Sequence, residues 1–175
     1  MYLRLILTII YFSVVLFSQN IEEKYKNMTS EEITTYIYKY YVNKLPLKIN
    51  KFDTITGIIP VRNEIIFRLD TDLKREMYFI NPKLYKMINF LKKTKKNFNE
   101  NNFFRELLKS NKGKKILKEN MKNQKNIQAK IFCHSKLDRY FLKKGLIVIY
   151  NYIDSEMGIF LGKYKISYKD CLNIK

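Results

Sequence analysis

Apolar residues recur along the chain at two different spacings, which separate predicted helices from predicted strands. Thr29 and Glu32 have the spacing of a capping box, and the residues after them carry an apolar stripe at helical spacing. The stripe consists of Ile33, Tyr36, Ile37, Tyr40 and Tyr41. It stops before Leu45-Pro46, so the pattern predicts one helix that begins near residue 30 and ends before the proline.

Two other regions alternate with the period of a strand. Residues 54–61 and 64–70 predict a hairpin around Arg62-Asn63, because Ile65, Phe67 and Leu69 alternate with Glu64, Ile66 and Arg68. Pro60 has no amide donor, so its strand is expected at a sheet edge or at a bulge. Residues 146–153, a turn at 154–158 and a further strand predict a second hairpin. In that last strand we expect one face to hold Phe160, Tyr164, Ile166 and Tyr168, and the other Leu161, Lys163, Lys165 and Ser167.

The pattern in the middle of the chain, residues 82–144, predicts helices. Asn81-Pro82 has the composition of an N-cap followed by a first-turn proline, and Leu84, Met87, Ile88 and Leu91 then share one helical face. A second helix is predicted from about Asn101, with an interruption at Asn111-Lys112-Gly113 and a weaker apolar pattern beyond it. Ser135 and Asp138 have capping spacing for another helix, which Gly145 is suited to end.

Together these elements predict a single α+β domain over residues 19–175. We expect an antiparallel sheet of two hairpins, packed on one face against several helices, with residues 82–144 as a basic helical insertion between the hairpins. The length after residue 18 suits one domain with an adequate core.

The first 18 residues predict export. A single charge, Arg4, precedes an apolar run from Leu5 to Phe17, which has the length of a signal peptide and is short for a membrane span. Cleavage near Gln19 would leave a periplasmic or secreted protein. An uncleaved segment that anchors the protein to the inner membrane is the alternative, since tilt or thinning accommodates a short span.

Export makes the two cysteines informative. Outside the cytosol a pair of thiols tends to oxidise, so we expect Cys133 and Cys171 to form a disulfide that ties a helix to the final strand. Closing a loop of about 39 residues would stabilise the fold by roughly 4 kcal/mol in the chain-entropy model. The alternative is two unpaired buried cysteines in a cytosolic protein, which requires the signal prediction to be wrong.

Several of these features together resemble small exported, disulfide-containing envelope proteins of bacteria whose activity is uncharacterised. The residues that carry the resemblance are Leu45-Pro46, the hairpin from Asp53-Thr54 to Phe67, Cys133, Arg139, Gly145, Tyr150, Tyr152 and Asp170-Cys171. They are structural features, so the resemblance implies the architecture and export but no particular activity. The Lys-rich stretch from Lys92 to Lys122 is longer than that pattern requires.

The positive charge of the chain is the sequence feature that indicates most about its function. The chain has a net charge of +18, and residues 82–144 hold 19 Lys or Arg against 4 Asp or Glu, a net +15. We expect a helical face to contact an anionic partner through Lys92, Lys93, Lys95, Lys96, Lys112, Lys114 and Lys115.

Export favours anionic lipid, lipopolysaccharide or an acidic envelope protein as that partner over nucleic acid. Phe98, Phe103 and Phe104 could add stacking or membrane insertion. A nucleic-acid-binding protein of DNA uptake or transfer machinery is an alternative. A second alternative is that the lysines reflect an AT-rich genome and only solvate the helices.

Catalytic patterns are sparse, and neither a metal site, a cofactor nor a small-molecule substrate is indicated. His134 is the single histidine, so any His-based triad or metal site depends on it. The pairs Asp70 with Asp72 and Asp154 with Glu156 could act as acid and base or bind calcium, but they fall at predicted strand ends, where such residues are common. We therefore expect a binding protein, with a small envelope hydrolase using His134 and a carboxylate as the alternative.

Overall fold

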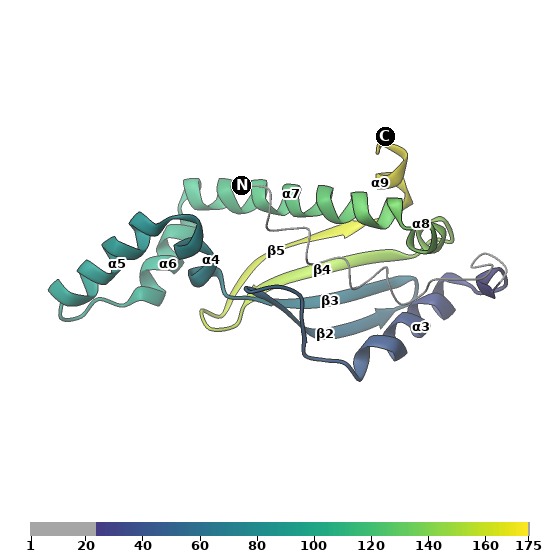
Figure 1. Cartoon of the computed structure of the whole chain (residues 1–175), viewed down its shortest axis with the longest axis horizontal. Coiled ribbons are helices and arrows are strands. Elements are labelled where there is room, and N and C mark those ends of the chain that lie inside the picture. The colour runs from purple at the N-terminus through teal and green to yellow at the C-terminus, as the bar shows by residue number, and fades with distance from the viewer. Residues whose placement is uncertain (1–23, 175) are drawn as a thin grey trace.

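The computed structural model describes residues 24–174, which fold into seven helices and one five-stranded sheet (Figure 1). The predicted signal segment, residues 1–18, lies outside the described residues. The strands are β1 (Leu47–Lys48), β2 (Asp53–Val61), β3 (Glu64–Thr71), β4 (Ile147–Asp154) and β5 (Ile159–Ile166). The helices are α3 (Ser30–Val42), α4 (Leu73–Ile80), α5 (Pro82–Thr94), α6 (Glu100–Lys109), α7 (Asn111–His134), α8 (Lys136–Lys143) and α9 (Tyr168–Leu172). The predicted α+β class is confirmed.

The sheet contains both predicted hairpins, but it is mixed rather than wholly antiparallel. Its order is β1-β2-β3-β4-β5, and β3 pairs with β4 in parallel while the other neighbours are antiparallel. The helical segment causes this difference. It carries the chain from the end of β3 back along the sheet to the opposite end, where β4 begins, so the two strands run in the same direction (Figure 1).

Alternation along the strands places the core on one face of the sheet. Ile65, Phe67 and Leu69 on β3 are buried, as predicted, and Val148 and Tyr150 on β4 continue the same face. Helix α3 packs against β2 and β3, and α7 packs against β5 (Figure 1). The prediction that helices cover one face of the sheet is therefore confirmed.

A bulge in β5 corrects the predicted faces of the last strand. Tyr152 pairs with Gly162 and Ile153 with Phe160, so Leu161 is an extra residue in the ladder. As a result Leu161 is buried and Phe160 is 59% exposed, which reverses the predicted sides of these two residues. Tyr168 also does not share a strand face, because it begins α9.

The position of Pro60 in β2, the other irregular strand, agrees with the prediction that this proline lies at a sheet edge or a bulge. Strand β1 pairs only with Ile55 and Thr54 at the start of β2, so Pro60 lies farther along, where β2 is the sheet edge. The same strand has a bulge between Ile55 and Gly57. Pro60 therefore sits where a missing amide donor costs no ladder hydrogen bond.

Local capping fixes the helix starts much as the sequence predicts. Thr29 and Glu32 form both hydrogen bonds of a capping box at α3. The Asn81 side chain accepts from the Leu84 amide ahead of α5, and Ser135 accepts from the Asp138 amide ahead of α8. Each cap satisfies an amide that would otherwise have no partner in the first helical turn.

Two features of the helical segment differ from the prediction. Helix α4 was not anticipated; Asp72 caps it by accepting from the Arg75 amide directly after β3. The break between α6 and α7 falls at Ser110, so Asn111-Lys112-Gly113 form the first turn of α7 instead of an interruption. Gly113 suits this tight junction, because a Cβ there would lie 2.2 Å from the Leu107 carbonyl oxygen.

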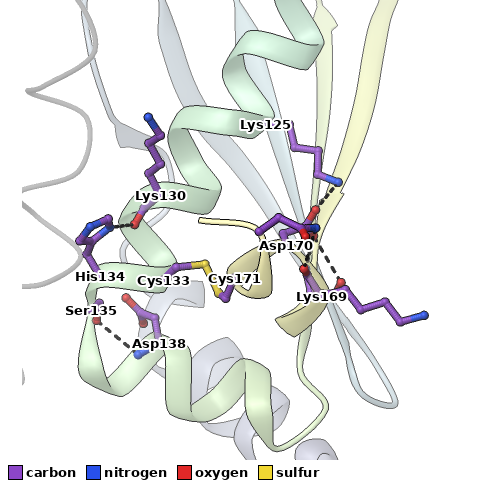
Figure 2. The surroundings of a disulfide bond; sticks show 11 residues. Lys125, Lys130, Cys133, His134, Ser135, Asp138, Lys169, Asp170 and Cys171 are labelled. Carbon is purple, nitrogen blue, oxygen red and sulfur yellow. Dashed lines mark hydrogen bonds and ion pairs between the residues drawn. A yellow bond between two sulfur atoms is a disulfide. The ribbon is translucent and has the colours of Figure 1, made fainter. Parts of the chain in front are cut away.

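The predicted disulfide is present and joins Cys133 to Cys171 (Figure 2). Cys171 lies in α9, so the bond connects the end of α7 to this short helix and not to the final strand. An ion pair between Lys125 and Asp170, 2.6 Å apart, links the same two helices. Burial raises the pKa of Asp170, but hydrogen bonds from Lys125 and from Ser167 outweigh it and hold the pKa below its ordinary value.

Candidate surface for an anionic partner

Helices α4, α5 and α6 extend beyond the end of the sheet and lead into the start of α7 (Figure 1). We call α5, α6 and the loop between them the projecting hairpin; it covers residues 82–109. Phe104 and Leu108 on α6 belong to the buried core of the body, whereas Ile88 on α5 is buried outside that core. The hairpin therefore has a defined inner side, and the rest of its surface faces solvent.

The predicted binding lysines fall into two groups on this part of the molecule. The tip group, Lys93, Lys95 and Lys96, lies at the end of α5 and in the following loop. The root group, Lys112, Lys114 and Lys115, lies in the first turns of α7. All six side chains are exposed. Helix α6 separates the groups, and its 10 residues span about 15 Å. The structure thus provides two cationic groups instead of one continuous cluster.

Lys92, the seventh predicted residue, has a structural contact. Its Nζ lies 3.0 Å from a carboxylate oxygen of Glu100, which also accepts a hydrogen bond from the hydroxyl of Tyr78. Burial raises the pKa of Glu100, but the bonds from Tyr78 and Lys92 outweigh it and keep the pKa below its ordinary value. Lys92 therefore helps to fasten α5 to α6 and α4, and its charge is partly neutralised.

The two groups of lysines differ in how the dipole of their own helix affects them. Lys92 and Lys93 lie in the last turn of α5, where the helix dipole favours cations. The root group lies at the opposite helix end, where the dipole disfavours them, and the first turn of α7 contains no acidic residue. Helix stability therefore accounts for part of the tip group but not for the root group.

The aromatic residues that we expected to assist binding are mostly covered. Phe104 is fully buried, and Phe98 and Phe103 are half-buried in ring contacts with their neighbours. The exposed apolar side chains of the hairpin are instead Tyr85, Met87 and Phe90 on α5. Met87 was predicted on the apolar face of α5 but is 44% exposed, because the inner side of the helix is narrow and centres on Ile88.

The two predicted carboxylate pairs come together at one end of the sheet. Asp70 and Asp72 follow β3, Asp154 and Glu156 follow β4, and the four residues line one hollow with Phe52 and Thr54. The parallel pairing of β3 and β4 explains this, since parallel strands bring their carboxyl ends to the same edge. The sequence alone indicated two separate pairs.

Each of these carboxylates already has protein donors. Asp70 accepts from the amide and hydroxyl of Ser155, and Asp154 accepts from the amides of Leu73 and Met157. Asp72 caps α4, and Glu156 pairs with Lys74. Within residues 24–174, no group of three or more His, Cys, Asp or Glu side chains has the geometry of a metal site. The cluster is therefore explained by turn formation and helix capping.

His134 lies at the other end of the molecule, as the last residue of α7 beside the disulfide (Figure 2). Its Nδ1 is 2.6 Å from the carbonyl oxygen of Lys130, which makes the ring a local hydrogen-bond partner of its own helix end. The carboxylate cluster lies beyond β4, whose 8 residues span about 26 Å. The structure does not bring His134 together with either predicted carboxylate pair.

Comparisons with known proteins give matches to solved structures only. No family model matches the sequence, and no curated protein matches it. One similar solved structure is that of a Pseudomonas aeruginosa protein provisionally classed as secreted, at 12% identity and a TM-score of 0.49, covering 89% of this chain and 99% of that one.

A second is a pilotin from the Vibrio vulnificus type 2 secretion system, at 10% identity and a TM-score of 0.45, covering 86% of this chain and 94% of that one. Likenesses this distant carry no argument about function. Among residues 24–174, no helix combines the length and the apolar character needed to cross a bilayer.

Proposed function

We propose that the protein is an exported binding or accessory protein of a bacterial envelope, which acts through an anionic partner and not through catalysis. The partner contacts the root and tip groups of lysines on and beside the projecting hairpin. Anionic lipid, lipopolysaccharide and acidic envelope proteins share the negative charge that these groups would recognise.

The root group is the observation that carries this proposal. Three exposed lysines occupy the first two turns of α7, a position that costs helix stability at the positive end of the dipole. An anionic partner would remove this cost, because its charge would lie next to both the lysines and the helix end. The disulfide supports the exported setting, since such bonds persist in oxidising compartments.

Three variants with the same loss of charge test the proposal. The root variant is Lys112→Gln, Lys114→Gln and Lys115→Gln, and the tip variant is Lys93→Gln, Lys95→Gln and Lys96→Gln. The control variant is Lys39→Gln, Lys136→Gln and Lys143→Gln, which changes exposed lysines on α3 and α8. Lys92 stays unchanged in all three because of its pairing with Glu100.

Binding is measured by sedimentation with vesicles of equal parts phosphatidylglycerol and phosphatidylcholine, and by retention on heparin, over a salt series. We expect binding of the wild type to weaken steeply with salt, and the root variant to bind on the order of 10-fold more weakly. The control variant should remain close to the wild type. Equal losses in all three variants would contradict a local surface, because they would show that only net charge matters.

A further inference from the structure

Helix α5 presents a solvent-facing side on which apolar and cationic residues are interleaved. Lys83, Met87 and Phe90 follow one another at spacings of four and three residues, as do Lys86, Phe90 and Lys93. We call these five residues the outer face of α5. Phe90 is 64% exposed and Met87 is 44% exposed, and the three lysines are exposed as well.

The outer face is held on a helix whose position is set from its other side. Ile88 is fully buried beneath α5, and Tyr85 packs edge-to-face on Tyr78 of α4. Asn81 and Pro82 fix the start of the helix, and the Lys92–Glu100 pair links its last turn to α6. Met87 and Phe90 therefore do not help to hold α5 in place, and their exposed side chains contribute little to the stability of the fold.

The positive charge around the outer face of α5 indicates which kind of partner this face binds. From Lys83 to Lys96 the chain holds six lysines and no Asp or Glu, so the apolar side chains lie in a wholly cationic setting. A helix that rests in the plane of an anionic membrane surface combines these features: apolar side chains enter the acyl boundary while lysines reach the headgroups.

Other anionic partners fit the outer face less well. The lysines and the ring of Phe90 would also suit nucleic acid, but Met87 offers neither a cation nor a flat ring that could stack on a base. An acidic protein would need a groove shaped for α5, whereas a bilayer accepts a helix that projects from the body (Figure 1). The projecting position leaves room for such a flat surface.

We propose that the outer face of α5 docks on anionic phospholipid bilayers, with Met87 and Phe90 entering the interface and Lys83, Lys86 and Lys93 contacting the headgroups. This inference rests on the proposed function and names its partner class. Docking orients the protein with its projecting hairpin toward the membrane.

The chain contains no tryptophan, so a single introduced one reports directly on insertion. Phe90→Trp is placed in the outer face, and Leu172→Trp, at a 66% exposed position on α9, is the control. On vesicles of equal parts phosphatidylglycerol and phosphatidylcholine, we expect Phe90→Trp emission to shift to the blue and to be quenched by acyl-brominated lipid. Leu172→Trp should do neither.

A second pair of variants separates insertion from charge. Met87→Ser with Phe90→Ser should weaken binding to these vesicles about 10-fold or more, since the buried apolar area is lost, while Leu172→Ser should not.

If the protein binds these vesicles but Phe90→Trp shows neither shift nor quenching, or the serine pair binds normally, docking through α5 is overturned and the anionic surface stands. If wild-type protein binds heparin but not the vesicles, the lipid assignment fails alone. If it binds neither, the proposed function fails as well.

Discussion

Single residues show where the fold depends on an exact fit. Gly113 lies in the first turn of α7, where a Cβ would meet the carbonyl oxygen and Cα of the preceding helix end at 2.2 and 2.8 Å. Gly57 lies in β2, where a Cβ would meet Arg68 only at 3.5 Å, an ordinary contact. The two glycines therefore have different roles, although the sequence gives no sign of the difference.

We expect Gly113→Ala to lower the free energy of unfolding by about 2 kcal/mol or more, because backbone must move to relieve the clash. Gly57→Ala should change it by less than about 0.5 kcal/mol. Urea unfolding followed by circular dichroism measures both values. Equal stability of the two variants would show that the junction of α6 and α7 is looser than described.

Asp138 provides a residue-level prediction about pH. Burial raises the pKa of this carboxyl from an ordinary 3.8 to about 6, and the hydrogen bond with Ser135 only partly opposes the effect. The folded protein therefore binds a proton more tightly than the unfolded chain. Asp138 favours folding below about pH 4, and this contribution is lost as the pH rises through about 6.

Asp138→Asn should remove this dependence while keeping the side chain's shape. The difference in unfolding free energy between the variant and the wild type should shift in favour of the variant between pH 4 and pH 6.5, by up to about 3 kcal/mol. Chemical denaturation at several pH values measures it. A difference that does not change with pH would mean that the carboxyl titrates normally in the folded protein.

At the scale of elements, the sequence predicts best what depends on neighbouring residues. The caps of α3, α5 and α8 and the two hairpins follow from short patterns such as Thr29 with Glu32 and Asn81-Pro82. The bulge at Leu161 and the parallel pairing of β3 with β4 were not foreseen, because both depend on contacts between residues far apart in sequence. Helix α4 was missed because it is short and follows β3 without a Pro or Gly.

The disulfide makes a prediction about elements that pack at one end of the sheet. It connects α7 to α9, a helix of only five residues that the Lys125–Asp170 ion pair also links to α7. Replacing both cysteines, Cys133→Ala with Cys171→Ala, should cost roughly 4 kcal/mol in the chain-entropy model.

The cost should appear as a lower urea midpoint that matches that of the wild type after reduction. An unchanged midpoint in both cases would mean that the Lys125–Asp170 pair and the buried core hold α9 without the bond.

At the scale of the whole molecule, the fold brings some residues together and separates others in ways that their order along the chain does not reveal. The sequence shows a lysine-rich region, but the structure divides its lysines into a tip and a root group separated by α6, and it gives Lys92 a structural partner. It also places His134 and the carboxylate cluster at opposite ends of the sheet. The parallel pairing of β3 with β4 gathers the carboxylates at one end of the sheet, and α7 carries His134 to the other end, so only tertiary packing determines these positions.

The most direct test of the account is the distribution of the protein in cells of its native host. Fractions from cells expressing the wild type, the root variant or the control variant are compared after extraction at low and high salt. We predict that the wild type and the control variant lie outside the cytosol, bound to the envelope until high salt releases them, whereas the root variant is already released at low salt. Protein in the cytosol, or a root variant that behaves like the control, would contradict the account.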